Sequence, residues 1–115
     1  MQGDERRVVA AFCAWLRERG WTVSTEIEFC DVVASRGAER LFAEAKGRTA
    51  AIGLDVDTAY GQLLRRMPLE ADDARFALVV PEEALQAVLR VPARVRQLLR
   101  LDIYAVAADG TVAAR

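Results

Sequence analysis

Two carboxylates and one amine between positions 31 and 46 have the residue types and spacing of a site for a hard metal ion. Lys46 is the only lysine among 16 basic residues, and it follows Glu44 by two positions. Asp31 precedes both in a separate apolar segment. The chain has no histidine, which removes the commonest general base and the commonest transition-metal ligand. Any metal must therefore be held by oxygen atoms, which Mg²⁺ and Mn²⁺ prefer.

A tight turn at Gly37 and Ala38 predicts that the two acids face each other. A type II′ turn with glycine first pairs residues whose numbers sum to 75. Asp31 then lies directly opposite Glu44, and Lys46 falls on the same face two residues further along. We expect the same face to carry Phe29, Val33 and Phe42. We expect the other face to carry Cys30, Val32, Ala43 and Ala45.

Opposed carboxylates on a half-buried sheet face repel, and loss of solvent strengthens the repulsion. A divalent ion between Asp31 and Glu44 would remove this repulsion, with the carbonyl oxygen of Ala45 as a third ligand. Lysine, unlike arginine, can become a neutral amine in a protein and then position or deprotonate water. The alternative is a surface ion pair between Glu44 and Lys46, but the aromatic neighbours make this face a poor candidate for open solvent.

The first half of the chain predicts the elements that position these residues. Apolar residues recur at helical spacing over 4–19, with Asp4 as the N-cap. Residues 21–35 are expected to be extended, with a bend near Glu26, and residues 40–47 to form a further strand. These segments should form an antiparallel hairpin that carries the candidate site.

The second half of the chain alternates helices and strands. Asp55 or Asp57 can cap a helix that ends at Pro68. The uniformly apolar run over 76–80 is typical of a strand buried on both faces. A helix opened by Pro81 and a final strand pair complete the chain. The order predicts an α/β fold: a mixed central β-sheet flanked by helices, with an αβββαβ core and an added C-terminal helix and strands.

Length and composition fit one domain over residues 1–115, because 115 residues with 53% hydrophobic content can bury one core. No apolar run approaches the ~20 residues of a membrane helix, and the charged N-terminus lacks the apolar stretch of a secretion signal. We therefore expect a soluble cytoplasmic protein. Cys13 and Cys30 lack metal-site spacing and are expected in the core. A net charge of -1 excludes a generally basic surface but not a local basic strip.

Two segments carry a resemblance to a known family. "FCDVVA" and "RLFAEAKG", with a helix before them and a helix containing "AYGQLLRRM" after them, resemble the PD-(D/E)xK, or restriction-endonuclease-like, nuclease superfamily. The resemblance covers most of the chain, from the first helix to the strand over 76–80. In that family the acidic pair binds magnesium, the lysine assists the attacking water, and a phosphodiester bond is cleaved. By resemblance these roles fall on Asp31, Glu44 and Lys46.

The same resemblance suggests Glu5 as an auxiliary acid and Gln62 as a supporting residue. Both have structural alternatives, because an acid in a first helical turn is favoured by the helix dipole and Gln62 can be an exposed polar residue. Asp55 is better explained as a helix cap than as a ligand. Two departures stand out: Cys30 replaces a frequent proline, and Arg66 replaces the tyrosine of one subgroup, to which we do not assign the chain.

The resemblance implies metal-dependent hydrolysis of nucleic acid, with DNA the expected form and Mg²⁺ or Mn²⁺ the cofactor. Five arginines are expected to line a phosphate path beside the site, with solvated surface as the alternative: Arg36, Arg40, Arg48, Arg65 and Arg66. So small a chain would grip a duplex poorly alone, so we expect a homodimer or a subunit of a larger assembly. The alternatives are a non-catalytic nucleic-acid-binding or scaffolding module with this fold, and an unrelated α/β domain with structural charges.

Overall fold

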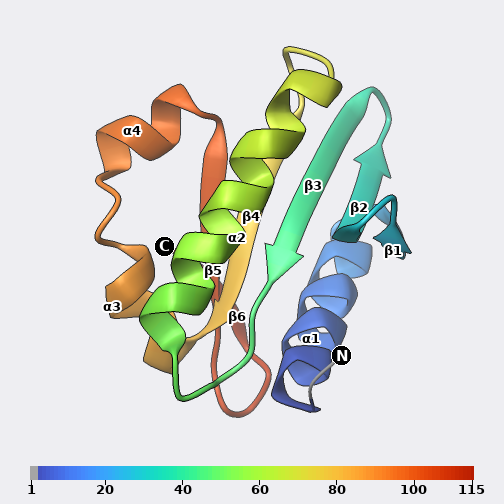
Figure 1. Ribbon diagram of the computed structural model, residues 1–115. Helices are drawn as coiled ribbons and strands as arrows, with labels where there is room; N and C mark the ends of the chain where they lie inside the picture. Colours follow the sequence, from blue (N-terminus) through green and yellow to red (C-terminus); the bar gives the residue numbers. More distant parts are fainter. Residues whose placement is uncertain (1–2) are drawn as a thin grey trace.

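The computed structural model describes residues 3–115, and its strands form one six-stranded sheet (Figure 1). The strands follow one another across the sheet in chain order. Neighbouring strands from the first to the third are antiparallel, the third to the fifth are parallel, and the sixth is again antiparallel. The elements are α1 (Gly3–Glu18), β1 (Thr22–Ile27), β2 (Cys30–Arg36), β3 (Glu39–Ala45), α2 (Ile52–Arg66), η1 (Met67–Leu69), β4 (Arg75–Pro81), η2 (Glu82–Ala84), α3 (Leu85–Val88), α4 (Ala93–Leu98), β5 (Leu101–Val106) and β6 (Val112–Ala114).

Helices cover both faces of this mixed sheet, so the predicted α/β class is confirmed. On one face α1 buries Val8, Phe12 and Leu16 against β2, β3 and β4. On the other face α2, which lies along the sheet in Figure 1, buries residues such as Val56 and Leu63 in a second cluster that also includes parts of β5 and α3. β4 is buried on both faces, as its uniformly apolar sequence predicts. No helix among residues 3–115 is long and apolar enough to span a bilayer.

The hairpin of β2 and β3 has the predicted register. Val32 pairs with Ala43 and Val33 pairs with Phe42, so the paired numbers sum to 75. Gly37 has a φ of 59°, which places the glycine in the left-handed region at the first central position of the turn, as a type II′ turn requires. The turn therefore sets which strand residues lie opposite each other.

The predicted positions of Phe29 and Cys30 are wrong. β1 and β2 are joined by a two-residue turn at Glu28 and Phe29, both of which have positive φ. Phe29 therefore lies in the turn, fully exposed, and not on the strand face with Phe42. β2 begins at Cys30, directly after this left-handed segment, so the alternation of its side chains does not hold at its first residue. Cys30 therefore packs in the cluster on the α2 side of the sheet.

The predicted helix caps are also wrong. α2 begins at Ile52 with Ala51 as its N-cap and without a side-chain cap, so Asp55 lies in its first turn and Asp57 lies inside the helix. Asp55 instead accepts a hydrogen bond from the hydroxyl of Thr49. Helix boundaries shift in this way because acids are favoured throughout a first helical turn, not only at the cap.

Candidate functional site

Asp31 and Glu44 meet where β2 begins and β3 approaches its end. The N–H of Ala45 on β3 donates to Oδ2 of Asp31 at 2.8 Å. The two carboxyl groups lie close enough for Asp31 to raise the pKa of Glu44. The two acids thus converge on one spot, and we call the region around them, with Glu5 and Lys46, the carboxylate end of the sheet.

Burial makes the charge on Glu44 unfavourable. Its residue surface is only 5% exposed, and desolvation is the largest cause that raises the pKa of Glu44 to about 8. The hydrogen bond and the negative charge of Asp31 raise this pKa further, while the backbone N–H of Asp31 and the charge of Lys46 lower it. Near neutral pH the pair therefore retains a proton that a cation could replace.

Lys46 and Glu5 lie near this pair, as their electrostatic effects show. The positive charge of Lys46 acts on the carboxyl groups of both Glu44 and Glu5. Burial, followed by the charge of Asp31, raises the pKa of Glu5. The backbone N–H of Lys46 donates to the carbonyl of Val79 at 3.0 Å, which ties this residue to the parallel neighbour β4. Asp31 and Lys46 therefore lie within electrostatic reach of both Glu44 and Glu5.

A close backbone contact brings Glu5 to the site. A Cβ atom placed on Gly47 would lie 2.4 Å from the backbone nitrogen of Glu5 and 2.8 Å from the carbonyl carbon of Asp4. No real side chain tolerates such distances, so only glycine lets the first turn of α1 pass here. The next N–H along, that of Arg48, donates to the Asp4 carboxylate. Asp4 therefore holds the segment after β3, instead of capping α1 as predicted.

Gln62 completes the site from α2. It lines a cavity of about 290 Å³ together with Glu44, and the other walls are Glu28, Phe29, Arg65, Arg66 and Leu69. Its Oε1 atom is buried, and no hydrogen-bond donor among residues 3–115 reaches it. The unpaired Oε1 of Gln62 lines the same cavity as the carboxyl group of Glu44. A cation or a water molecule bound there would give this oxygen a partner.

The donor set fits a hard divalent ion. Among residues 3–115 no three His, Cys, Asp or Glu side chains are grouped closely enough to hold a metal by themselves. Two carboxylates remain, and magnesium sites often use one or two carboxylates with water or substrate phosphate as further ligands. The backbone N–H of Ala45 points to Asp31, so its carbonyl lies on the same edge of β3, where the sequence places a third oxygen ligand.

The five predicted arginines do not form one path. Arg65 and Arg66 line the cavity beside Glu44, and Arg48 forms an ion pair with Glu83 at 3.2 Å. Arg40 lies four residues before Glu44 on β3, about 13 Å away along the strand. Arg36 is at the turn end of the hairpin, about 16 Å from Asp31, and it is the clearest departure from the predicted position.

Arg36 is also fully engaged in local contacts. Its guanidinium forms an ion pair with Glu39 at 3.2 Å, donates to the carbonyl of Arg19 at 3.0 Å, and lies 4.5 Å from the Trp21 ring. These contacts connect the hairpin turn to the end of α1. Its role in the structure is therefore to stabilise the turn, away from the carboxylate pair.

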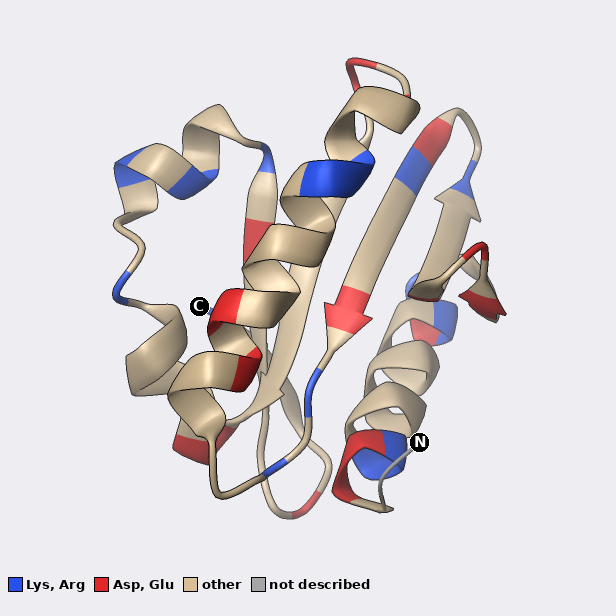
Figure 2. Cartoon of the chain, viewed as in Figure 1, with Lys and Arg blue, Asp and Glu red and all other residues tan. Residues whose placement is uncertain are grey.

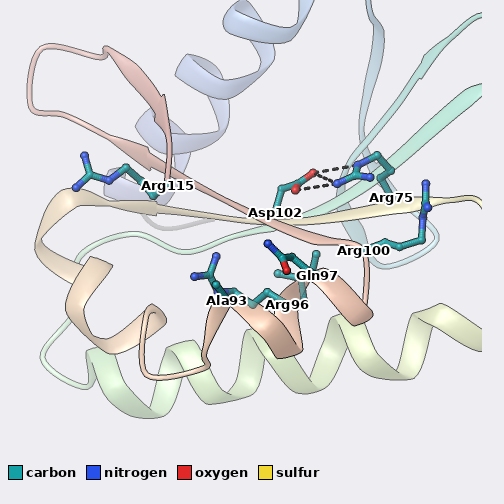
Figure 3. Close-up of a pocket in the computed structure, with 8 residues that line it drawn as sticks. Arg75, Ala93, Arg96, Gln97, Arg100, Asp102 and Arg115 are labelled. Carbon is teal, nitrogen blue, oxygen red and sulfur yellow. Dashed lines mark hydrogen bonds and ion pairs between the residues drawn. The ribbon is translucent and has the colours of Figure 1, made fainter.

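A separate cavity of about 460 Å³ lies near the opposite ends of β4 and β5 (Figure 3). Four arginines are among its walls: Arg75, Arg96, Arg100 and Arg115. Asp102 is the acid in this wall, and Arg75 binds it through two guanidinium nitrogens at 2.8–3.1 Å. We call this region the arginine end. Neither Asp31 nor Glu44 lines it, because Arg75 lies at the start of β4 whereas Glu44 lies near the end of the parallel strand β3, beside Leu78.

Comparison with known proteins identifies the fold. No protein-family model and no curated protein matches the sequence. Two solved structures match the fold: an XisH family protein from Nostoc punctiforme PCC 73102 and an fdxN element excision controlling factor protein from Anabaena variabilis. Their sequence identities are 15% and 14%, and both have a TM-score of 0.63. The alignments cover 93% and 94% of this chain and 96% of each neighbour, so the whole architecture is shared.

The sequence did not predict what three residues contribute to the site: Gly47 had no expected role, Arg66 was expected on a phosphate path, and Phe29 was expected on the strand face. Gly47 directly follows Lys46. The reason for a glycine at this position is the close approach of the first turn of α1, which only the structure shows. Arg66 has a side chain that is only 12% exposed, and its Nη1 donates to the carbonyl of Glu28 at 2.8 Å. Phe29 lines the cavity from the turn that Arg66 holds. The sequence gives no signal for this turn, because neither Glu28 nor Phe29 is a residue that turns prefer.

Proposed function

We propose that this chain is a metal-dependent nuclease of the PD-(D/E)xK type, which hydrolyses phosphodiester bonds in nucleic acid, with DNA as the expected substrate. The observation that carries the proposal is the convergence of Asp31 and Glu44, neither of which forms a salt bridge with an arginine or lysine among residues 3–115. A structural pair of charges would be expected to pair with opposite charge, as buried charges generally do. Two acids that raise each other's energy are better explained by a bound Mg²⁺ or Mn²⁺.

The residues of the site divide the work. Asp31, Glu44 and the carbonyl of Ala45 would hold the ion. When bound, the ion supplies activation of water and neutralisation of charge in the transition state. Lys46 would orient the attacking water and accept its proton, a role open to lysine and closed to arginine. Glu5 and Gln62 would hydrogen-bond to water and keep it on the attacking side of the phosphate.

The surroundings support a nucleic-acid substrate. Arg65 is exposed beside the cavity and offers a positive charge to a phosphate. One structural neighbour is described as an excision controlling factor, a description consistent with a protein that acts on nucleic acid. The chain has a net charge of -1, so we expect substrate binding to be shared with a second copy or with a larger assembly.

The test is cleavage of single-stranded and double-stranded DNA and RNA with Mn²⁺ by the wild type, Lys46→Ala and Lys46→Arg. We expect both variants to lose at least about 100-fold in rate, the usual contribution of a positioned acid or base. Lys46→Arg keeps the positive charge and removes the proton acceptor, so it separates the two roles. Equal rates for the wild type and Lys46→Ala would remove the catalytic assignment.

The second candidate is a non-catalytic nucleic-acid-binding or scaffolding module with the same fold. The burial of Glu44 argues against it, because a module without catalysis has no use for a carboxylate with a pKa of about 8. Nucleic-acid binding that is unaffected by Mn²⁺ and by Lys46→Ala, without any cleavage, would favour this second function.

A further inference from the structure

The turn between β1 and β2 has a backbone that its residues do not favour. Ile27 pairs with Cys30, which leaves Glu28 and Phe29 as the two central residues of a hairpin turn. Their φ angles are 50° and 65°. Positive φ at both positions is the type I′ pattern, for which Asn and Gly are strongly preferred. A bulky residue such as phenylalanine at positive φ is an outlier, and such outliers concentrate at functional sites.

Burial does not explain the phenylalanine either. The side chain of Phe29 is fully exposed, so the fold gains no apolar contact from it. Its place in the molecule is nevertheless specific, because it lines the same cavity as Glu44 and Gln62. An aromatic ring thus stands in a strained turn, in open solvent, at the wall of the candidate catalytic cavity.

Arg66 fixes the position of this turn. Its Nη1 donates to the carbonyl of Glu28 at 2.8 Å, and its Nη2 lies 3.7 Å from the Glu28 carboxylate. The guanidinium itself is packed 4.8 Å from the ring of Phe42 and pairs with Glu70 at 3.2 Å. The turn is therefore anchored to α2 and to the core, and the ring of Phe29 is presented from a fixed point.

We propose that Phe29 forms a base-stacking subsite, which binds an unstacked nucleobase next to the phosphodiester that is cut. The preferred substrate is then single-stranded or locally unpaired nucleic acid, because bases inside a duplex do not expose their faces. An aromatic ring beside exposed arginine is the usual arrangement for binding single strands, where every base can stack. The inference rests on the nucleic-acid substrate proposed above.

A protein partner is the competing occupant of Phe29. A protein that covered the ring would also cover the cavity that holds Glu44 and would block access to it. The exposed Arg65 in the cavity wall favours an anionic ligand with a flat apolar part over an apolar protein surface. A nucleobase therefore fits the ring and its charged surroundings better than a protein surface does.

The binding test uses a single-stranded oligonucleotide that contains 2-aminopurine, whose fluorescence falls when it stacks, with Mg²⁺ and protein in the Lys46→Ala background. We expect Phe29→Leu, which keeps an apolar side chain and removes the aromatic face, to weaken binding roughly 5- to 100-fold and to abolish quenching. Phe29→Trp should retain both. Leu98→Ala, at an exposed apolar position on α4, is the matched control and should bind as before.

A stability measurement separates function from structure. Phe29→Gly places glycine where the turn prefers it, so we expect a higher unfolding midpoint together with weaker oligonucleotide binding. A residue kept for folding would give the opposite sign, a lower midpoint. That result, or unchanged quenching in Phe29→Leu, would overturn the subsite. Affinity that survives in Phe29→Leu without any quenching would indicate a plain apolar contact, as for a protein surface, and would overturn it as well.

Cleavage by the wild type keeps the two proposals apart. If the wild type cleaves with Mn²⁺ but Phe29→Leu has unchanged KM and kcat on single strands, the nuclease stands and the stacking subsite fails. If no substrate is cleaved but quenching still depends on the ring of Phe29, the stacking subsite stands and the nuclease fails.

Discussion

The two ends of the sheet handle charge in opposite ways. At the arginine end, Asp102 accepts a bidentate hydrogen-bonded ion pair from Arg75, with distances of 2.8–3.1 Å (Figure 3). At the carboxylate end, Asp31 and Glu44 face each other, and burial raises the pKa of Glu44 to about 8. Figure 2 shows acidic positions at the end of β3 and at the start of α1, and basic positions on α4.

The difference lies in the partners and not in the residue types. Two further arginines of the arginine end are held by backbone carbonyls: Nε of Arg96 donates to Val91 at 3.1 Å, and Nε of Arg100 donates to Ala74 at 3.3 Å. The acid of that end therefore has a cationic partner, and these arginines have hydrogen-bond acceptors. The carboxylate end is electrostatically unfavourable in the protein alone, which is the usual condition of a functional site.

The largest expected effect is the loss of cleavage activity on substitution of Glu44, which separates the carboxylate end from the arginine end. We expect Glu44→Gln to reduce Mn²⁺-dependent cleavage by at least about 100-fold, because it removes a charged oxygen ligand. Asp102→Asn, a matched loss of one carboxylate at the arginine end, should leave the cleavage rate unchanged. Steady-state rates on one substrate compare the two variants directly. Similar losses in both would show that the two ends are not functionally distinct.

The pH dependence of stability tests the electrostatic difference. The folded state holds a proton on Glu44 up to about pH 8, whereas the unfolded glutamate releases it near pH 4.5. The folded state therefore binds more protons in this window, so the free energy of unfolding falls as pH rises through it. The pKa rise from 4.5 to about 8 corresponds to a loss of roughly 5 kcal/mol at most across this window.

Glu44→Gln isolates this contribution. The variant should lose less stability than the wild type over the same pH window and should be the more stable of the two above pH 8. Urea unfolding at a series of pH values measures both curves. Parallel curves for wild type and variant would mean that Glu44 is not the unfavourable charge.

The close contact at the carboxylate end predicts a smaller effect. Gly47→Ala forces a Cβ atom against the backbone of Glu5, so the first turn of α1 must move, at a cost of about 2 kcal/mol. Gly3→Ala is the matched control, because its Cβ would meet no atom within 4 Å. Thermal unfolding should show a loss for the first variant only. A neutral Gly47→Ala would break the link between this glycine and the position of Glu5.

The smallest expected effect is at the arginine end. Asp102→Asn removes the ion pair with Arg75. The side chain of Arg75 is 40% exposed and that of Asp102 is 36% exposed. Partly exposed pairs are screened by water, so we expect a loss of only about 0.5–1 kcal/mol, which decreases as salt is added. Chemical unfolding at low and high ionic strength measures it. A loss that is independent of salt would contradict a surface ion pair.

The sequence predicted the carboxylate end because its geometry is local. One glycine, Gly37, sets the turn, and the turn sets the register of β2 against β3 up to the pair of Val32 and Ala43, the neighbours of Asp31 and Glu44 in the chain. Strand alternation and the lone lysine supplied the rest. The α/β class followed from the alternation of helices and strands, which the observed element order confirms.

The parts that the sequence did not predict depend on contacts between distant segments. Glu28 and Phe29 have positive φ although neither is a glycine or asparagine, so the sequence does not predict this turn. The hydrogen bond from Arg66 that holds the turn joins residues 38 positions apart in the chain. Because the turn at Glu28 and Phe29 was not predicted, Cys30 was expected on the wrong face of the sheet. Arg36 was expected near the site from its residue type alone, and only the hairpin's length shows that it lies at the other end.

The central claim is that Asp31 and Glu44 form a site for a divalent ion, and thermal unfolding with Mn²⁺ above pH 8 tests it most directly. A ligand that binds only the folded state raises stability by about 2.7 kcal/mol at a hundred times its Kd. We predict a higher midpoint with Mn²⁺ for the wild type and none of this rise for Glu44→Gln. A wild-type midpoint indifferent to Mn²⁺, or an equal rise in the variant, would contradict the account.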